Sequence, residues 1–274
     1  MRILLSLCLS FLGLTSLSNA QDTTPNDLKL YVFDCGEIYF PDLDDFSTSG
    51  DYAGISSTFA ASCYLIRHKD GDLLWDLGLP IEILGKDLVI GDEQSVSLKE
   101  TLVDQLASID VKPSDIEFLS ISHSHWDHTG QIADFSSQTW LVNKKEADYM
   151  FSTEEGANYN AGFKDLKKVV FEKDYDVFGD GSVMILDTPG HTPGHTVLQV
   201  MLPETGPVLL TGDIYHQTKS RELKRVPRFN YDEPQTRQSI ERFEEIVEAL
   251  DAKVIIQHEK MDIEKLPKIP AYLK

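Results

Sequence analysis

The stretch from Ser122 to Gly130 holds three histidines and an aspartate, in the order His123, His125, Asp127 and His128. His123 and His125 are two positions apart, so on extended chain both side chains point the same way. Asp127 and His128 follow after the chain turns, where they can reach a second ion. Imidazole and carboxylate groups are typical ligands of a borderline cation such as zinc. The alternative is a polar surface loop, but three of only 8 histidines beside an aspartate favour a metal site.

Other ligand-type residues follow other predicted strands, and they extend this pattern: Asp76, His195, Asp213 and His258. Seven of these residues have the chemistry of a site for two metal ions: His123, His125, Asp127, His128, His195, Asp213 and His258. The predicted ligands of one ion are His123, His125 and His195. Those of the other ion are Asp127, His128 and His258. Asp213 is predicted to bridge the two ions with its two carboxylate oxygens.

Two cations a few ångströms apart can share a water molecule and convert it to hydroxide near neutral pH. Such a nucleophile requires no serine or cysteine. Asp76 is predicted to orient one of the ligand histidines through a hydrogen bond. His191 and His216 are predicted to lie near the site, supporting a ligand or facing the substrate, with a structural role as the alternative.

The elements that must position these residues are strands alternating with helices. The histidine-rich stretch follows an apolar, β-prone run at 116–121. Further strands are predicted at 28–33, 62–67, 72–75, 139–142, 182–187, 196–202, 208–211 and 254–256. Helices are predicted at 97–109, 144–151 and 235–250. Polar clusters after strands are typical of α/β proteins, and without an internal linker the sequence predicts one domain over 21–274.

The N-terminus predicts export. Residues 1–20 combine a positive start, a long apolar run and Ser18-Asn19-Ala20, which are typical of a cleaved signal peptide. An uncleaved anchor is the alternative, although the run is short for a membrane span. We therefore predict a periplasmic or secreted protein without stable membrane insertion after cleavage. Export would permit a disulfide between Cys35 and Cys63, but two buried free thiols are the interpretation that the sequence favours.

The composition restricts the partners. The formal net charge is -20 and the hydrophobic content is 41%. A chain this acidic repels phosphate backbones, which argues against nucleic acid. It still permits a small substrate at a metal centre, because bound cations reverse the local field.

At these residues the chain resembles the metallo-β-lactamase superfamily, which has an αββα sandwich fold. The matching features are H-x-H-x-D-H at His123 to His128, Gly-His at His195, Gly-Asp at Asp213 and a late histidine at His258. The resemblance covers nearly all of the chain after residue 20. The pattern is highly specific for the superfamily and only weakly specific for the reaction.

Within the superfamily the chain looks most like the N-acyl homoserine lactonases, through the Thr-Pro-Gly-His repeat at 188–195, Leu-Thr-Gly-Asp at 210–213 and the opening Leu-Tyr-Val-Phe. The resemblance implies two Zn2+ ions, a small-molecule lactone substrate, attack by a metal-bridging hydroxide, and Asp127 as the proton carrier. These lactonases typically have a substrate-facing tyrosine three residues after the bridging aspartate. Here His216 has that place and Tyr215 precedes it, so either one can be the group that polarises the carbonyl.

Two alternatives remain open on the sequence. One is another hydrolase of the same fold, such as a glyoxalase II-like thioesterase or an aryl- or phosphoester hydrolase. The other is a non-catalytic zinc protein. The metal identity, the acyl-chain preference and a homodimer are also left open. The segments 36–61 and 214–233 are predicted to be irregular and to form two walls beside the metals, with an acyl-tail contact among Phe40, Phe46, Tyr52 and Phe59.

Overall fold

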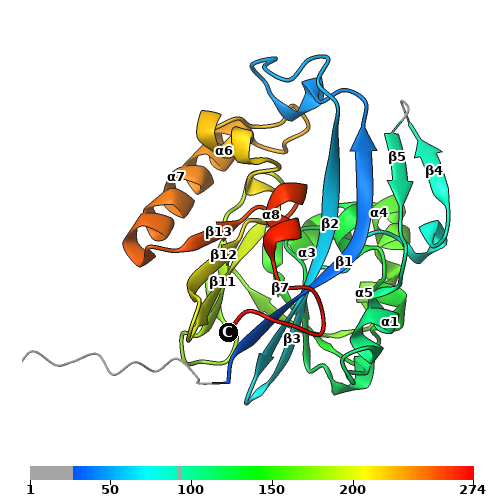
Figure 1. Cartoon of the computed structure of the whole chain (residues 1–274), viewed down its shortest axis with the longest axis vertical. Helices are drawn as coiled ribbons and strands as arrows, with labels where there is room; N and C mark the ends of the chain where they lie inside the picture. Colours follow the sequence, from blue (N-terminus) through cyan, green and yellow to red (C-terminus); the bar gives the residue numbers. More distant parts are fainter. Residues whose placement is uncertain (1–26, 92–93) are drawn as a thin grey trace, which may run out of the picture.

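Two β-sheets lie face to face in this computed structural model, which describes residues 27–91 and 94–274 (Figure 1). The larger sheet has eight strands in the order β4-β5-β1-β2-β3-β6-β7-β8. Their bounds in that order are Asp87–Ile90, Gln94–Ser97, Lys29–Phe40, Ser57–His68, Gly71–Trp75, Phe118–Ser120, Thr139–Asn143 and Lys167–Phe171. The predicted signal peptide, 1–20, falls outside the described residues.

The smaller sheet has five strands in the order β13-β12-β11-β10-β9. Their bounds in that order are Lys253–Ile255, Gly206–Leu210, Thr196–Leu202, Val183–Asp187 and Tyr175–Asp176. The helices α1 to α8 span Leu102–Ala107, Trp126–Thr129, Lys144–Met150, Glu154–Tyr159, Ala161–Lys164, Thr218–Leu223, Glu233–Leu250 and Lys260–Lys265.

Helices cover the outer face of each sheet, and this arrangement confirms the predicted αββα sandwich. The inner layer buries side chains of both sheets together, such as Trp75 and Leu198. On one flank α1, α3 and α5 pack on the larger sheet, and on the other α7 packs on the smaller sheet (Figure 1). The apolar side chains of both faces of the central strands are therefore removed from water, which is the main stabilising contribution to such a fold.

Helix α7 shows how local sequence fixes an element. The Asp232 side chain accepts a hydrogen bond from the Gln235 N–H, and a proline occupies the first turn, where its missing N–H has no cost. Ile240 and Phe243 then face the smaller sheet, with at most 2% of either side chain exposed. The helix predicted at 235–250 is confirmed, and its cap places its first residue at Glu233.

Three predicted segments are wrong in their extent. The segment 214–233 is not irregular throughout, because it contains the helix α6. The segment 36–61 is not irregular throughout, because β1 continues past a register shift between Asp34 and Glu37, and β2 begins at Ser57. The irregular part is therefore 41–56. The helix predicted at 97–109 is reduced to α1, because Ser97 still belongs to strand β5 and the Thr101 side chain caps the helix by accepting the Asp104 N–H.

The disulfide is a correction as well. Cys35 and Cys63 are bonded, with their Cα atoms 5.9 Å apart, so the free-thiol interpretation is wrong. The two cysteines lie on β1 and β2, close to the register shift of β1. Antiparallel pairing brings residues 28 positions apart to bonding distance, which no spacing in the sequence announces.

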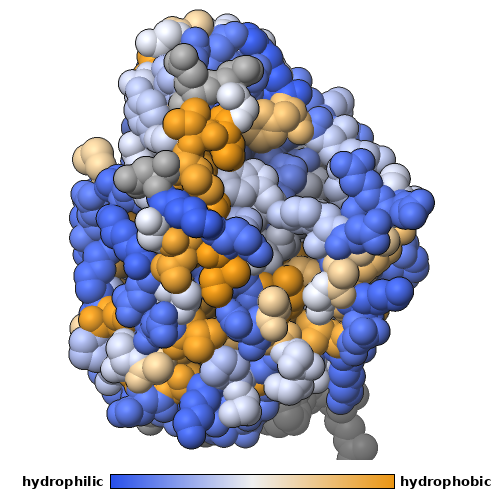
Figure 2. Space-filling model, turned by 90° about the vertical axis from the view of Figure 1, so that its right-hand side faces the viewer, coloured by the Kyte–Doolittle hydropathy of each residue, from blue (hydrophilic) through white to orange (hydrophobic). Residues whose placement is uncertain are grey.

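Strand β4 is the outer edge of the larger sheet and pairs with β5. The face that carries this edge shows apolar side chains interleaved with hydrophilic ones (Figure 2). Val89 on β4 is 70% exposed, and Ile81 and Leu84, which precede β4 in the sequence, are also exposed. Among the described residues, no helix is both long and apolar enough to cross a bilayer.

Candidate active site

Four loops that follow strands bring the ligand-type side chains together. His123 to His128 follow β6, His191 lies in the loop after β10, Asp213 follows β12 and His258 follows β13. The carboxyl ends of strands are where layered α/β proteins place their sites, because the loops there converge over the edge of the sheet. The residues that follow different strands in the sequence thus become neighbours in space.

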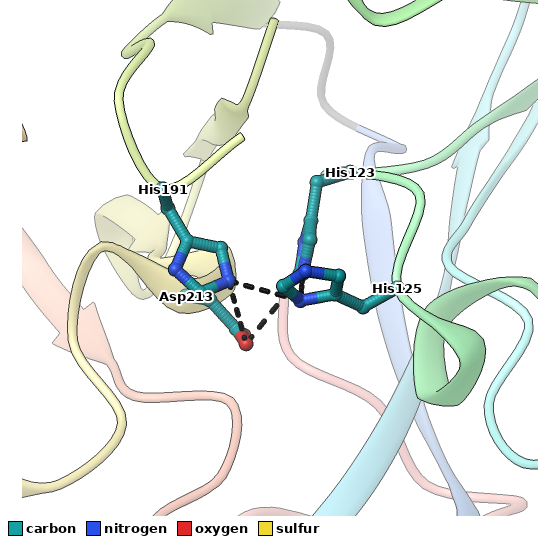
Figure 3. A group of neighbouring side chains, drawn as sticks. All are labelled: His123, His125, His191 and Asp213. Carbon is teal, nitrogen blue, oxygen red and sulfur yellow. Dashed lines mark hydrogen bonds and ion pairs between the residues drawn. The ribbon is translucent and has the colours of Figure 1, made fainter. Parts of the chain in front are cut away.

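The first group consists of His123, His125, His191 and Asp213, whose ligand atoms all lie within 4.8 Å of one another (Figure 3). The distance from His123 Nε2 to His125 Nδ1 is 2.8 Å, and from His191 Nε2 to His125 Nδ1 it is 3.1 Å. Asp213 Oδ2 lies 3.6 Å from His123 Nε2 and 3.5 Å from His191 Nε2. Imidazole nitrogens this close, all directed at one point, have the composition of a cation site.

The second group consists of Asp127, His128 and His258. Asp127 Oδ2 lies 3.7 Å from His128 Nε2 and 3.6 Å from His258 Nε2. Asp213 reaches this group with its other oxygen, since Oδ1 lies 3.3 Å from His128 Nε2 and 2.9 Å from His258 Nε2. Asp213 therefore stands between the groups with one oxygen toward each, which is the position predicted for a bridging ligand.

The far ring nitrogens are held by the protein, and the near ones are left for a ligand. His128 Nδ1 lies 3.0 Å from Asp76 Oδ2, and His258 Nδ1 donates to the Ala60 carbonyl at 2.7 Å. His128 Nε2 and Asp213 Oδ1 are buried and, among the described residues, make no well-directed hydrogen bond, although Asp213 Oδ1 lies close to the Nε2 atoms of both His128 and His258. Buried polar atoms are rarely left unpaired, and histidines fixed through the opposite nitrogen are typical of metal sites. The residues present therefore fit a pair of cations.

The electrostatics of the two groups differ. Burial lowers the pKa of His125 to about 3 and holds the pKa of His123 well below its usual value. Burial also opposes the charge of His128, but the Asp213 and Asp127 carboxylates outweigh it and raise the pKa of His128 well above its usual value. The lowered pKa values of His123 and His125 favour neutral imidazoles, the form that binds cations, whereas the raised pKa of His128 favours its protonated form, from which a cation would have to displace the proton.

His195 differs from its predicted role. Its Nδ1 lies 3.1 Å from both the Thr188 carbonyl and the Thr188 hydroxyl, and its Nε2 accepts the Asp213 N–H at 2.9 Å. Both ring nitrogens are therefore engaged within the protein, and His195 holds the backbone of Asp213 in place. His191 takes the position in the first group that we predicted for His195, and its own Nδ1 lies 2.9 Å from Asn230 Oδ1.

Tyr215 also differs from its predicted role. Its side chain is 1% exposed, packs against Phe243 and donates a hydrogen bond to Glu244 at 2.9 Å, away from the metal groups. His216 instead lines the pocket beside them, with Nε2 3.1 Å from Asp213 Oδ2 and its ring stacked on His258. Successive residues of extended chain point to opposite sides, so only one of the two can face the site.

Asp76 lies where we predicted, and the structure adds a partner that sequence reasoning missed. Its Oδ1 accepts the Ser122 N–H at 2.6 Å, and its Oδ2 accepts from the Gln257 amide at 2.5 Å as well as facing His128. Gln257 precedes the ligand His258 and is 1% exposed. Its place beside a ligand was the only signal in the sequence, since a glutamine has no metal chemistry of its own.

A pocket of about 320 Å³ opens above the two groups. Asp127, Asp213, His216 and His258 line its floor. Its walls combine polar side chains, such as Asp42, Asp45 and Gln94, with apolar ones from β1, β2, α2 and two loops. The apolar residues are Ile38, Phe40, Phe46, Phe59, Trp126 and Phe229. Three of the four rings among which we predict a tail contact thus line the pocket, whereas Tyr52 is buried behind it and its hydroxyl lies 3.4 Å from the Ser220 hydroxyl.

Comparison with known proteins agrees with this geometry. Residues 57–258 match the model of the metallo-beta-lactamase superfamily. An N-acyl homoserine lactonase, AttM, of Agrobacterium fabrum is 32% identical over 85% of this chain and 94% of its own. The lactonase AiiA of Bacillus thuringiensis subsp. kurstaki is 26% identical over 77% of this chain and 86% of its own.

A solved structure shares the fold. It is an N-acyl homoserine lactone hydrolase with the product N-hexanoyl-L-homoserine bound at the catalytic metal centre. The TM-score is 0.78 at 26% identity, over 89% of this chain and 98% of that one. The present chain therefore belongs to the metallo-beta-lactamase superfamily. Within it, the chain is a metal-dependent hydrolase of the N-acyl homoserine lactonase-like kind.

Proposed function

We propose that this protein is a dinuclear zinc hydrolase that opens the lactone ring of N-acyl homoserine lactones. The observation that carries the proposal is the sharing of Asp213 between two ligand groups at the floor of a pocket with aromatic side chains in its walls. The proposed ligands of one ion are His123, His125 and His191, and those of the other are Asp127, His128 and His258. The printed names of the relatives support the lactone as substrate.

Two zinc ions bound here would supply an activated water near neutral pH and a Lewis acid for the carbonyl oxygen. The side chains of this chain then have separate roles. His216, at the edge of the floor, is placed to donate to the carbonyl oxygen as charge develops there, in the place of the tyrosine of similar lactonases. Asp127 faces both the second group and the pocket, and it carries the proton to the ring oxygen.

The overall reaction adds one water across the ester bond. A new bond forms between the water oxygen and the carbonyl carbon, and the bond from that carbon to the ring oxygen breaks. The ring oxygen receives the proton that Asp127 carries, and the product is an open hydroxy acid. An alkoxide is a poor leaving group, so this protonation is the step at which a positioned carboxyl group has the largest effect.

The pocket also favours a neutral substrate. The described residues that line it include the carboxylates of Asp42, Asp45, Asp127 and Asp213 but no lysine or arginine. A glutathione thioester or a phosphoester would bring carboxylates or phosphate that this wall leaves unpaired. The apolar rings instead match a flexible hydrocarbon tail, whose burial contributes roughly 0.8 kcal/mol for each methylene.

We also propose export of the mature chain, with cleavage after Ala20. The disulfide between Cys35 and Cys63 supports this location, because such bonds persist in oxidising compartments. N-terminal sequencing of protein from the extracytoplasmic fraction tests it. Cytosolic protein that still begins at Met1 would refute the proposal.

One panel tests the activity. Zinc-loaded protein is given acyl homoserine lactones, lactoylglutathione, and nitrophenyl carboxylic and phosphate esters at equal concentration. We expect the lactones to have the highest kcat/KM, and opening of the ring to release one proton per turnover. A preference for the thioester or the phosphate ester would contradict the lactonase proposal.

A further inference from the structure

A buried glutamate connects the two loops that carry the first ligand group. Glu146 is the third residue of α3 and only 2% exposed. Its Oε1 accepts the Ser124 N–H at 2.8 Å. Its Oε2 accepts the Thr192 hydroxyl at 2.7 Å and the Gly194 N–H at 2.9 Å. Three donors thus satisfy a carboxylate that, among the described residues, has no ion pair with a lysine or arginine.

The donors to Glu146 lie next to histidines of the first ligand group. Ser124 stands between His123 and His125, and Thr192 directly follows His191. His191 approaches His125 from a separate loop, as Figure 3 shows, and only 3.1 Å separates their nitrogens. Glu146 therefore bonds to both sides of the gap that a cation in the first group would bridge.

The packing around Glu146 shows that the contact is built into the fold. A Cβ atom on Gly194 would lie 2.3 Å from the Glu146 backbone nitrogen, so only glycine allows the loop to approach α3 this closely. The Asn143 side chain accepts the Lys145 N–H and caps the same helix, which fixes its first turn. The second Thr-Pro-Gly-His unit of the 188–195 repeat thus serves to seat the loop on α3.

We propose that Glu146 is a positioning residue that fixes the separation of His125 and His191, and so controls the affinity of the first ligand group for its ion. The second group is supported elsewhere, by Asp76, Gln257 and the Ala60 carbonyl. Ser122 links the two groups, since its Oγ lies 3.1 Å from both His123 Nδ1 and His128 Nδ1. The Glu146 carboxylate, by contrast, bonds only to the two loops that carry the first group, within the part of the chain that the structure describes. This inference rests on the two-ion centre proposed above.

The test compares Glu146→Gln with Asp76→Asn by zinc titration against a chromophoric chelator. An amide at 146 turns one acceptor into a donor that faces another donor. We expect Glu146→Gln to weaken one of two ions by about 10- to 100-fold and to leave the other unchanged, since supporting partners of ligands have effects of that size. Asp76→Asn should weaken the other ion.

A His191→Ala background assigns the ions. There, adding Glu146→Gln should leave the remaining ion unchanged, whereas adding Asp76→Asn should weaken it. Thr192→Val removes one donor and should weaken the same ion as Glu146→Gln, while Thr192→Ser keeps the hydroxyl and should match the parent. If Glu146→Gln does not fold, the two Thr192 variants test the positioning role of Glu146 instead.

Two results would overturn the inference: an equal loss of both ions in Glu146→Gln, or a lower melting temperature of the metal-free protein with both affinities unchanged. The parent protein separates this inference from the proposed function. If the parent binds only one ion, the two-ion centre fails, and Glu146 is then judged by whether Glu146→Gln weakens that ion. If the parent binds two ions and Glu146→Gln binds both normally, only the role of Glu146 fails.

Discussion

The floor and the wall of the pocket are built in opposite ways. At the floor, His258 and the neighbouring His128 each have a ring nitrogen fixed by a hydrogen bond, and Asp213 is held through its own backbone N–H. On the wall, Phe46 makes edge contacts with Phe59 and Phe229 at ring centroid distances of 4.9 and 5.2 Å. Directional bonds fix atoms for chemistry, whereas ring contacts give a surface that adapts to tails of different length.

The wall is also joined across two long loops. Arg228 pairs with Asp44, and Arg225 pairs with Asp51, so the 41–56 segment is tied to the segment before α7. These pairs are partly or largely exposed, and exposed pairs contribute little to stability. The difference between directional bonds on the floor and ring contacts on the wall leads to a prediction. Substitutions on the floor should affect every substrate equally, whereas the effect of substitutions on the wall should depend on the length of the tail.

The largest effect is expected from Asp213→Ala. This change removes the carboxylate that has one oxygen toward each ligand group, so we expect one of the two ions to be lost. The kcat/KM should fall by about 10³-fold or more for short and long tails alike, because charge stabilisation at the reacting centre is lost. Elemental analysis of zinc-reloaded protein, together with lactone kinetics, measures both effects. A variant with two ions and full activity would contradict the bridging role.

The next effect is expected from Asp127→Asn. The amide can still bind through its oxygen but carries no proton, so zinc content should fall less than rate. We expect a loss of about 10²- to 10⁴-fold in kcat on lactones, the usual range for a positioned acid or base. A nitrophenyl ester is the control, since its leaving group needs no proton and its turnover should fall much less. Equal losses on both substrates would mean that Asp127 acts only as a ligand.

His216 lies where the floor of the pocket meets its wall. Its Nε2 faces Asp213, and its ring contacts Phe46 at a centroid distance of 5.1 Å. His216→Phe should lower kcat on lactones by about 10²-fold with unchanged zinc content, because one donor to the carbonyl oxygen is removed. His216→Tyr, which restores a donor, should recover part of this rate. Loss of zinc in His216→Phe would show instead that His216 is a ligand.

The smallest effect is expected from Phe46→Ala, and it should depend on the substrate. If the rings hold the tail, each methylene that loses contact raises KM by up to about fourfold, which corresponds to ~0.8 kcal/mol. Long-chain lactones should therefore suffer more than short ones, with kcat nearly unchanged. Tyr52→Phe is the matched control, since Tyr52 lies behind the pocket. A loss that is the same for all chain lengths would mean that Phe46 only stabilises the fold.

The sandwich fold and most of the ligand-type residues that the structure brings together are predictable from the amino-acid sequence alone. Apolar runs such as 116–121 become strands because both of their faces are buried, and the polar residues that follow them must then lie at one edge of a sheet. H-x-H-x-D-H is a local pattern, so it can be recognised from six consecutive residues. That these residues hold metal stays a prediction, but their convergence on Asp213 required no information beyond strand order.

Other assignments depend on tertiary contacts, because the local sequence does not distinguish the candidate residues. His191 and His195 follow identical Thr-Pro-Gly triplets, and they are separated by contacts from distant residues: Asn230 orients one, while Thr188 and the Asp213 N–H occupy both nitrogens of the other. Tyr215 turns away because Glu244 on α7 accepts its hydroxyl. Cys35 and Cys63 meet because β1 and β2 pair antiparallel. In each case the deciding contact comes from far along the chain, where local pattern carries no information.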